Sequence, residues 1–347
     1  MNVPTRHVRR SRAPLSRRPQ LGFQGSNGAE SWLRHYRRGG RLSAGACYAP
    51  FVTSLAPDLR RIRPHGWLGL ALVTVCWPLL WSPISLPLGA EAPGEYSRTQ
   101  VLFFPLWLGY ILAVDAATAW RSGTSQLVGS QRRFVALFFM SIPSWWLFEL
   151  LNLRTENWTY LGIHDMHPAQ YALLASVSFS TVIPAVFGTA ELLRTFQPFR
   201  DRAPHLAARP ADGLDAAVAA TGAVMLGLLL AWPRLFYPFL WLSIVFLLEP
   251  LNHVIGARSL LGELRASAWR FAASLAAGVL VCGFCWELWN WRANPKWVYD
   301  VPFFGFWHVF EMPLPGYLGY IPFAFELFAL VSLVDRIGSF ARTRPAQ

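Results

Sequence analysis

Two short segments of this chain hold the residue types needed for acid and base chemistry. The segments read FELLNLRTENWTY, residues 148–160, and WELWNWRANPKWVY, residues 286–299. Two carboxyl groups in an apolar site do not ionise together, so that one can donate a proton while its neighbour stays charged. The pattern therefore predicts carboxylate general acid/base chemistry at Glu149 and Glu287, and we expect these two side chains to approach each other as an acidic pair.

The two segments match each other position by position. The expected binding residues are Asn152, Arg154, Trp158 and Tyr160 in the first copy and Asn290, Arg292, Trp297 and Tyr299 in the second. The arginines stand close enough to pair with a carboxylate or with a ligand anion. The rings are suited to a pocket for a flat or cationic apolar group. Alternatively, the rings form a belt at the membrane interface, and the glutamates and arginines close the helix ends by ion pairing.

Matches continue outside these segments. Trp107 recurs as Trp241 and Asp115 recurs as Glu249, each 134 positions on. Trp77 recurs as Trp232, 155 positions on, because the first copy carries about twenty extra residues near 84–104. Matches over about 130 residues at nearly one offset are typical of an internal duplication. The copies differ at some polar positions, because Glu326 stands where the first copy has Gly188.

Composition places the chain in the membrane class. Hydrophobic residues make up 54% of the sequence and charged residues only 14%, which does not describe an ordinary soluble domain. We therefore expect an all-α integral membrane protein of about eight transmembrane helices, built as two parallel four-helix repeats. The stretches long enough to cross roughly 30 Å of hydrocarbon are 67–83, 102–119, 134–152, 169–193, 214–232, 236–253, 269–290 and 314–334.

The basic residues predict how these helices are oriented. Arginines gather in the N-terminal region, in the connections 120–133, 194–213 and 254–268, and in the C-terminal tail. Basic residues avoid translocation, so all of these segments and both termini are expected in the cytoplasm, with both motifs on the opposite side. The strong preference for arginine over lysine favours a bacterium with a GC-rich genome, and hence the inner membrane.

The net charge of +12 is concentrated at the N-terminus. This Arg-rich segment is predicted to be a disordered tail that contacts anionic lipid, to be a targeting segment, or to be non-native sequence from an upstream start codon; none of these requires nucleic acid. The predicted regions are the cytoplasmic tail 1–63, the first repeat 64–195, a cytoplasmic linker 196–213, the second repeat 214–336 and a cytoplasmic tail 337–347.

Ionisable residues inside the predicted spans are further candidates, because their burial in a membrane costs several kcal/mol. Glu326 is expected near the midplane of the last span, and Asp115 and Glu249 in the halves of their spans nearer the cytoplasm. The segment 310–326 contains three prolines and two glycines. Irregular backbone at membrane depth needs protein or water to satisfy it, which predicts a cavity or a re-entrant turn there, with a plain kinked helix as the alternative.

Histidines in the connections suggest a weaker metal hypothesis. His164 and His167 follow the first motif, and His308 and Glu311 follow the second. Imidazole and carboxylate groups are ligands of zinc, although a histidine cluster at a surface is more often simply solvated. No cofactor can be named from the sequence.

Two classes of function fit these observations. The first is a membrane-embedded enzyme that acts on a lipid or isoprenoid, with Glu149, Glu287 and Glu326 as acids and bases and tryptophans that stabilise a developing cation. Over a few residues, the pairing of tryptophan with glutamate in an aromatic-rich bundle resembles small integral-membrane terpene and carotenoid cyclases, which differ in span count and repeat plan. The second is a proton- or cation-coupled transporter or channel. A membrane scaffold without chemistry is the third alternative. The expected partners are membrane lipid and an apolar small molecule.

Overall fold

The protein is described here from a computed structural model, which places residues 62–82, 98–163, 166–199, 213–265 and 269–343. These residues belong to one compact unit. Nearly all of the predicted N-terminal tail and most of the predicted linker lie outside the described residues.

Within the described residues, seven helical segments are long and apolar enough to cross a membrane. They establish a multi-pass helical membrane protein. The expected first span is the helix α2, Pro64–Trp81, which is not among the seven. The seven segments are Thr99–Ser122, Gln131–Thr155, Pro168–Arg194, Leu214–Ala231, Pro233–Val254, Trp269–Asn290 and Leu314–Gly338.

These segments are built from the following elements. The long helices are α3 (Arg98–Ser122), α5 (Gln131–Thr155), α6 (Pro168–Phe179), α7 (Val182–Arg194), α8 (Leu214–Ala231), α10 (Ser243–Val254), α12 (Trp269–Asn290) and α13 (Tyr320–Thr343). The short helices are α4 (Gln126–Gly129), α9 (Pro233–Phe236), α11 (Leu260–Arg265), η2 (Gln197–Phe199), η3 (Tyr237–Trp241) and η4 (Leu314–Gly319). The strands are β1 (Trp158–Leu161), β2 (Lys296–Tyr299), β3 (His308–Val309) and β4 (Met312–Pro313).

Breaks in these helices keep their backbone groups satisfied. Between α6 and α7 the Ser141 hydroxyl on α5 donates to the carbonyl of Phe179 at 2.5 Å and accepts from the N–H of Ile183 at 3.1 Å. A side chain of a neighbouring helix thus replaces hydrogen bonds that the break removes, as helix interruptions in a membrane require. The irregular stretch predicted at 310–326 contains β4, η4 and the first residues of α13, and β3 directly precedes it.

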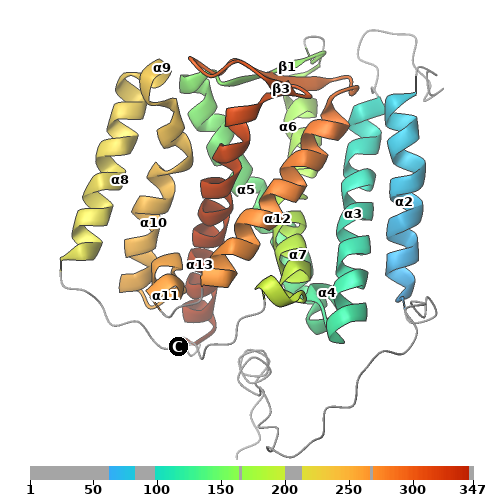
Figure 1. The fold of residues 1–347 in the computed structure, drawn as a ribbon, viewed down its shortest axis with the longest axis horizontal. Coiled ribbons are helices and arrows are strands. Elements are labelled where there is room, and N and C mark those ends of the chain that lie inside the picture. The colour runs from blue at the N-terminus through green and yellow to red at the C-terminus, as the bar shows by residue number, and fades with distance from the viewer. Residues whose placement is uncertain (1–61, 83–97, 164–165, 200–212, 266–268, 344–347) are drawn as a thin grey trace, which may run out of the picture. The chain divides into compact units, whose positions relative to one another are not determined.

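The helices pack in two sets of similar contacts. In the first half α2 packs on α3, and α3 and α5 pack on α7. In the second half α8 packs on α10, and α10 and α12 pack on α13. Figure 1 shows α2 beside α3 and α8 beside α10. Glycines permit these approaches, since a Cβ at Gly69 would meet the Gly109 carbonyl oxygen at 2.6 Å and one at Gly222 the Leu247 nitrogen at 2.9 Å.

The two sequence motifs meet in a small antiparallel sheet. Strand β1 pairs with β2, so that Trp158 lies opposite Tyr299 and Tyr160 lies opposite Trp297. The tryptophan of each copy therefore lies opposite the tyrosine of the other copy, which is the pairing that a local two-fold axis produces. Strands β1 and β3 lie at one end of the helices, called the strand end below, and α4 and α11 lie at the other (Figure 1).

Asp115 and Glu249 hold matched short helices at that other end. A carboxylate oxygen of Asp115 accepts from the N–H of Leu127 at 3.0 Å, and one of Glu249 accepts from the N–H of Leu261 at 2.9 Å. Both acceptors precede their donors by twelve residues. Asp115 also lies 3.1 Å from the imidazole of His65. The structure thus gives these two acids fixed backbone partners near the ends of their helices.

Candidate functional site

Glu149 forms the first carboxylate cluster, together with Trp145, Trp158 and Tyr160. Its Oε1 accepts hydrogen bonds from the Tyr160 hydroxyl at 2.6 Å, Trp145 Nε1 at 2.8 Å and Trp158 Nε1 at 3.2 Å. Burial raises the pKa of Tyr160 well above the usual phenol value, and the neighbouring Glu149 carboxylate raises it further. The phenol therefore remains protonated at neutral pH and donates to the carboxylate.

Glu287 forms the second carboxylate cluster, together with Trp297, Tyr299 and Tyr320. Its Oε1 accepts from the hydroxyls of Tyr299 and Tyr320, both at 2.7 Å, and from Trp297 Nε1 at 3.4 Å. The glutamate is 0% exposed, and its Oε2 has no partner among the described residues. Burial also raises the pKa of Tyr299 well above the usual phenol value, so this donor is neutral as well.

The two clusters obtain their third donor from different helices. The first uses Trp145 on α5, whose counterpart 138 residues later is Gly283 on α12. The second uses Tyr320 on α13, whose counterpart is Val182. A Cβ at Gly283 would lie 2.6 Å from the ring of Tyr320. The missing side chain at 283 therefore provides the space that the tyrosine ring fills.

The motif asparagines tie each strand to the end of its helix. Asn152 donates to the Trp158 carbonyl at 2.8 Å and accepts from the Trp158 N–H at 3.3 Å. Asn290 makes the same pair of bonds to Trp297, at 2.7 and 2.9 Å. Both asparagines are buried. This arrangement gives the repeated spacing of glutamate, asparagine, tryptophan and tyrosine a structural purpose, since it docks the sheet on the helices.

Asn290→Ala is expected to lower the free energy of unfolding by about 2–3 kcal/mol, because it removes two hydrogen bonds and leaves part-buried backbone groups of Trp297 unpaired. Unfolding in mixed detergent micelles would measure the loss, with Asn152→Ala as the matched change in the other half. A loss below about 0.5 kcal/mol, the size of an ordinary surface substitution, would contradict this assignment.

The expected acidic pair of Glu149 and Glu287 is not formed among the described residues. Each carboxylate bonds only to donors of its own cluster. The ring of Phe323 on α13 lies between aromatic residues of the two halves, 5.6 Å from that of Trp145 and 6.5 Å from that of Trp286. Several motif tryptophans are buried in the core, so they are not part of a lipid-facing belt.

Glu326 has no comparable set of partners. It lies at the midpoint of the span Leu314–Gly338 and is 0% exposed. Neither carboxyl oxygen has a hydrogen-bond partner among the described residues, and the backbone amide of Ile244 faces the group without a bond of normal geometry. No ion pair with a described basic residue reaches it. This is the most sparsely satisfied of the predicted acids.

The first half has different residues at the positions equivalent to Glu326 and its neighbour Ile244. Gly188 stands in place of Glu326, and Tyr110 stands in place of Ile244. The Tyr110 hydroxyl is 2.8 Å from the hydroxyl of Thr189, with which it forms a hydrogen bond. Beside the position equivalent to Glu326, the first half therefore contains a hydrogen-bonded neutral pair, whereas the second half contains an acid without a hydrogen-bond partner among the described residues.

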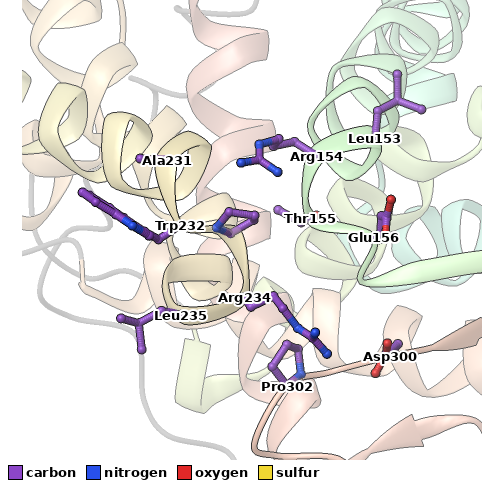
Figure 2. A pocket seen from close by; sticks show the side chains of 11 residues that line it. Leu153, Arg154, Thr155, Glu156, Ala231, Trp232, Arg234, Leu235, Asp300 and Pro302 are labelled. Atoms are coloured by element: carbon purple, nitrogen blue, oxygen red, sulfur yellow. The ribbon is translucent and has the colours of Figure 1, made fainter.

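The motif arginines do not pair with the motif glutamates. The Arg154 Nε donates to the carbonyl of Leu230 on α8 at 2.9 Å. The Arg292 guanidinium lies over the rings of Trp81 and Trp291, at 5.9 and 5.1 Å from their centroids. Arg154 also lines a cavity at the strand end, considered below with Figure 2.

The predicted metal ligands have other partners where they are described. His164 lies outside the described residues. His167 Nδ1 accepts from the N–H of Ala169 at 3.2 Å and so caps α6. Glu311 pairs with Lys296 at 2.6 Å, and His308 is exposed. The described residues contain no group of three or more ligand side chains arranged for a metal ion.

Two residues of these sites, Tyr320 and Arg234, are not among those selected from the sequence. Tyr320 lies in the segment 310–326, whose prolines and glycines are its prominent feature, and Arg234 follows Trp232 and Pro233. Arg234 lies on the side of the membrane where few basic residues are expected, which is the signal that could have identified it. Comparisons of the chain with protein-family models, with curated proteins and with solved structures find no match.

Proposed function

We propose that this protein is a proton-coupled membrane transporter in which Glu326 binds and releases the proton. The observation that carries the proposal is the Glu326 carboxyl, fully buried at the middle of a span without a hydrogen-bond partner or an ion pair among the described residues. An ionised carboxylate in such surroundings costs several kcal/mol. The neutral acid is the form that this conformation accommodates.

Release of that proton requires a second conformation. Water or a cation must reach Glu326 before the charged form becomes tolerable, and nothing reaches it while the side chain is fully buried. A transporter provides this change by exposing a central site to each side of the membrane in turn. Glu149 and Glu287 are poorer candidates for the proton, because neutral donors already stabilise their charged forms.

The paired contacts support two repeats that can move relative to each other. We infer eight spans with α2 as the first, and two four-helix repeats related by an axis along the membrane normal. Asp115 and Glu249 make equivalent hydrogen bonds in the two halves, as do Asn152 and Asn290, and these matches support this plan. Basic residues at the end opposite the strands support a cytoplasmic location of that end in a bacterial inner membrane.

Glu326→Gln is expected to abolish proton binding at the midplane while it preserves the fold, because glutamine has the same shape and does not titrate. The protein in lipid vesicles would be adsorbed on a solid-supported membrane, and the transient current after a pH jump would be recorded. Asp335→Asn, an exposed change on the same helix, is the control and should keep the current. An unchanged current in Glu326→Gln would remove the proposal.

An enzyme that acts on a lipid or isoprenoid is the second candidate. The observation in its favour is the Oε2 of Glu287, which has no described partner although Oε1 accepts from two tyrosines. A substrate atom at Oε2 would meet a carboxyl group positioned for proton transfer. Native mass spectrometry distinguishes the two functions, because an enzyme with Glu287→Gln should retain an unconverted apolar molecule.

A further inference from the structure

A cavity of about 590 Å³ lies at the strand end, and no residue of the two carboxylate clusters lines it. Its walls come from the end of α5, from the junction of α8 with α9, and from the segment after β2. Figure 2 shows Arg154 and Arg234 on different helices among the residues that line it, with Asp300 and Pro302 on the segment after β2. Two cationic residues of separate helices thus line one cavity.

Neither arginine is neutralised by a described acid. Arg154 uses its Nε for the Leu230 carbonyl, and no ion pair of Arg154 or Arg234 occurs within the described part of the chain. Glu156 and Asp300 also line the cavity but do not bond to either guanidinium. Guanidinium groups match the oxygens of a phosphate in charge and geometry, so the cavity is suited to a phosphate-type anion.

The segment beside this cavity exposes a cluster of large apolar side chains. Directly after Pro302, the sequence reads Phe-Phe-Gly-Phe-Trp at 303–307. Phe303 is 73% and Trp307 is 75% exposed. Both have positive φ angles, 65° and 51°, which bulky residues rarely adopt and which persist where the surrounding structure requires them.

Aromatic side chains exposed at the ends of membrane-spanning helices are stabilised at the boundary between headgroups and acyl chains. The helix ends at Ala231 and Thr155 line the same cavity, so its arginines lie at headgroup depth. A molecule with a phosphate next to acyl chains meets both features. A free phosphate ion would use only the arginines and would leave the aromatic segment without a role.

We propose that this cavity binds the phosphate of an anionic phospholipid through Arg154 and Arg234, while Phe303 and Trp307 contact its acyl chains. The ligand belongs to the leaflet at the strand end. The site is separate from Glu326, and its existence does not depend on proton coupling.

The test uses the full-length protein purified in detergent and native mass spectrometry with added dioleoylphosphatidylglycerol or dioleoylphosphatidylcholine. The double variant Arg154→Gln with Arg234→Gln is expected to bind phosphatidylglycerol about 10–30-fold more weakly. Each arginine near an anionic lipid surface increases the affinity by about three- to five-fold, and the variant loses two of them. Binding of phosphatidylcholine should change far less. Asp300→Asn should instead strengthen binding of phosphatidylglycerol, a gain that misfolding cannot produce.

Arg63→Gln with Arg132→Gln is the matched control, because both arginines are exposed and the pair removes the same charge away from the cavity. An equal loss of binding in this control would overturn the proposal, as would unchanged binding in the double cavity variant. A competition experiment with inorganic phosphate tests the remaining alternative ligand. If it displaced the lipid at concentrations comparable to those of the lipid, and if Phe303→Ser with Trp307→Ser had no effect, the site would be one for free phosphate.

Discussion

Glu287→Leu is expected to lower the free energy of unfolding by about 3–5 kcal/mol. Leucine removes the acceptor shared by the hydroxyls of Tyr299 and Tyr320 and by the indole of Trp297. The site is fully buried, so water does not replace the lost bonds. Loss of helicity with increasing sodium dodecyl sulfate in mixed micelles would give the free energy.

Glu149→Leu is the matched control, because it removes an acceptor with the same number of donors from a half-buried site. Its cost should be smaller, about 1–2 kcal/mol, since part of the lost hydrogen bonding can be replaced by solvent. Glu287→Gln should also cost little, because its amide oxygen still accepts. Equal losses in the two leucine variants would show that burial at 287 does not control the energy.

The second large effect concerns Gly283. A tryptophan at this position is expected to prevent the native packing of α12 against α13, because even a Cβ would lie 2.6 Å from the Tyr320 ring. Overpacking of this kind costs about 1–3 kcal/mol for small groups and more for an indole. Gly283→Trp combined with Tyr320→Val reproduces the pair formed by Trp145 and Val182 in the other half. The double variant should recover at least about 2 kcal/mol relative to Gly283→Trp alone.

Size-exclusion chromatography and thermal unfolding would measure this rescue. Gly283→Trp with Tyr320→Phe is the control, because it keeps the ring that blocks the indole and should show no recovery of stability. If Tyr320→Val gave no rescue, the donors of the two clusters would not be interchangeable and the repeat relationship would lose its clearest structural support.

The membrane class could be predicted from the sequence because it depends on sums over long segments. Each predicted span needed only an apolar average, so small local errors had little effect. The predicted span 236–253, for example, is divided between η3 and α10, but it still lies within the span Pro233–Val254. The contacts of Glu149 and Glu287 could not be predicted in this way, because they depend on where the residues that follow each helix lie in space.

That position depends on a sheet that local patterns did not indicate. Strands β1 and β2 contain only four residues each, and the paired residues are more than 130 positions apart in sequence. Periodicity within such short segments cannot identify a strand. The sequence therefore placed the glutamates correctly in helices and next to tryptophans, but it paired them with each other instead of with the tyrosines of the strands.

Pairs of residues on different helices that compensate for each other also could not be predicted from local sequence patterns. Gly283 has a clear meaning only beside Tyr320, and Ile244 only beside Glu326. Each half provides the missing comparison for the other, because Trp145 and Tyr110 show what the same positions hold in the first half. The arginine cavity likewise combines α5 with α9, which are distant in sequence.

The sheet of β1 and β2 has a mechanical consequence for the proposed transport cycle. It joins the ends of α5 and α12 through four residue pairs, with Thr159 opposite Val298 near its centre. If the two halves rotate relative to each other, this ladder acts as a pivot and its surroundings move least. The largest displacement then occurs at the far end, near α4 and α11, because that end is farthest from the pivot. Cross-linking β1 to β2 should leave such a movement intact, whereas cross-linking α4 to α11 should stop it.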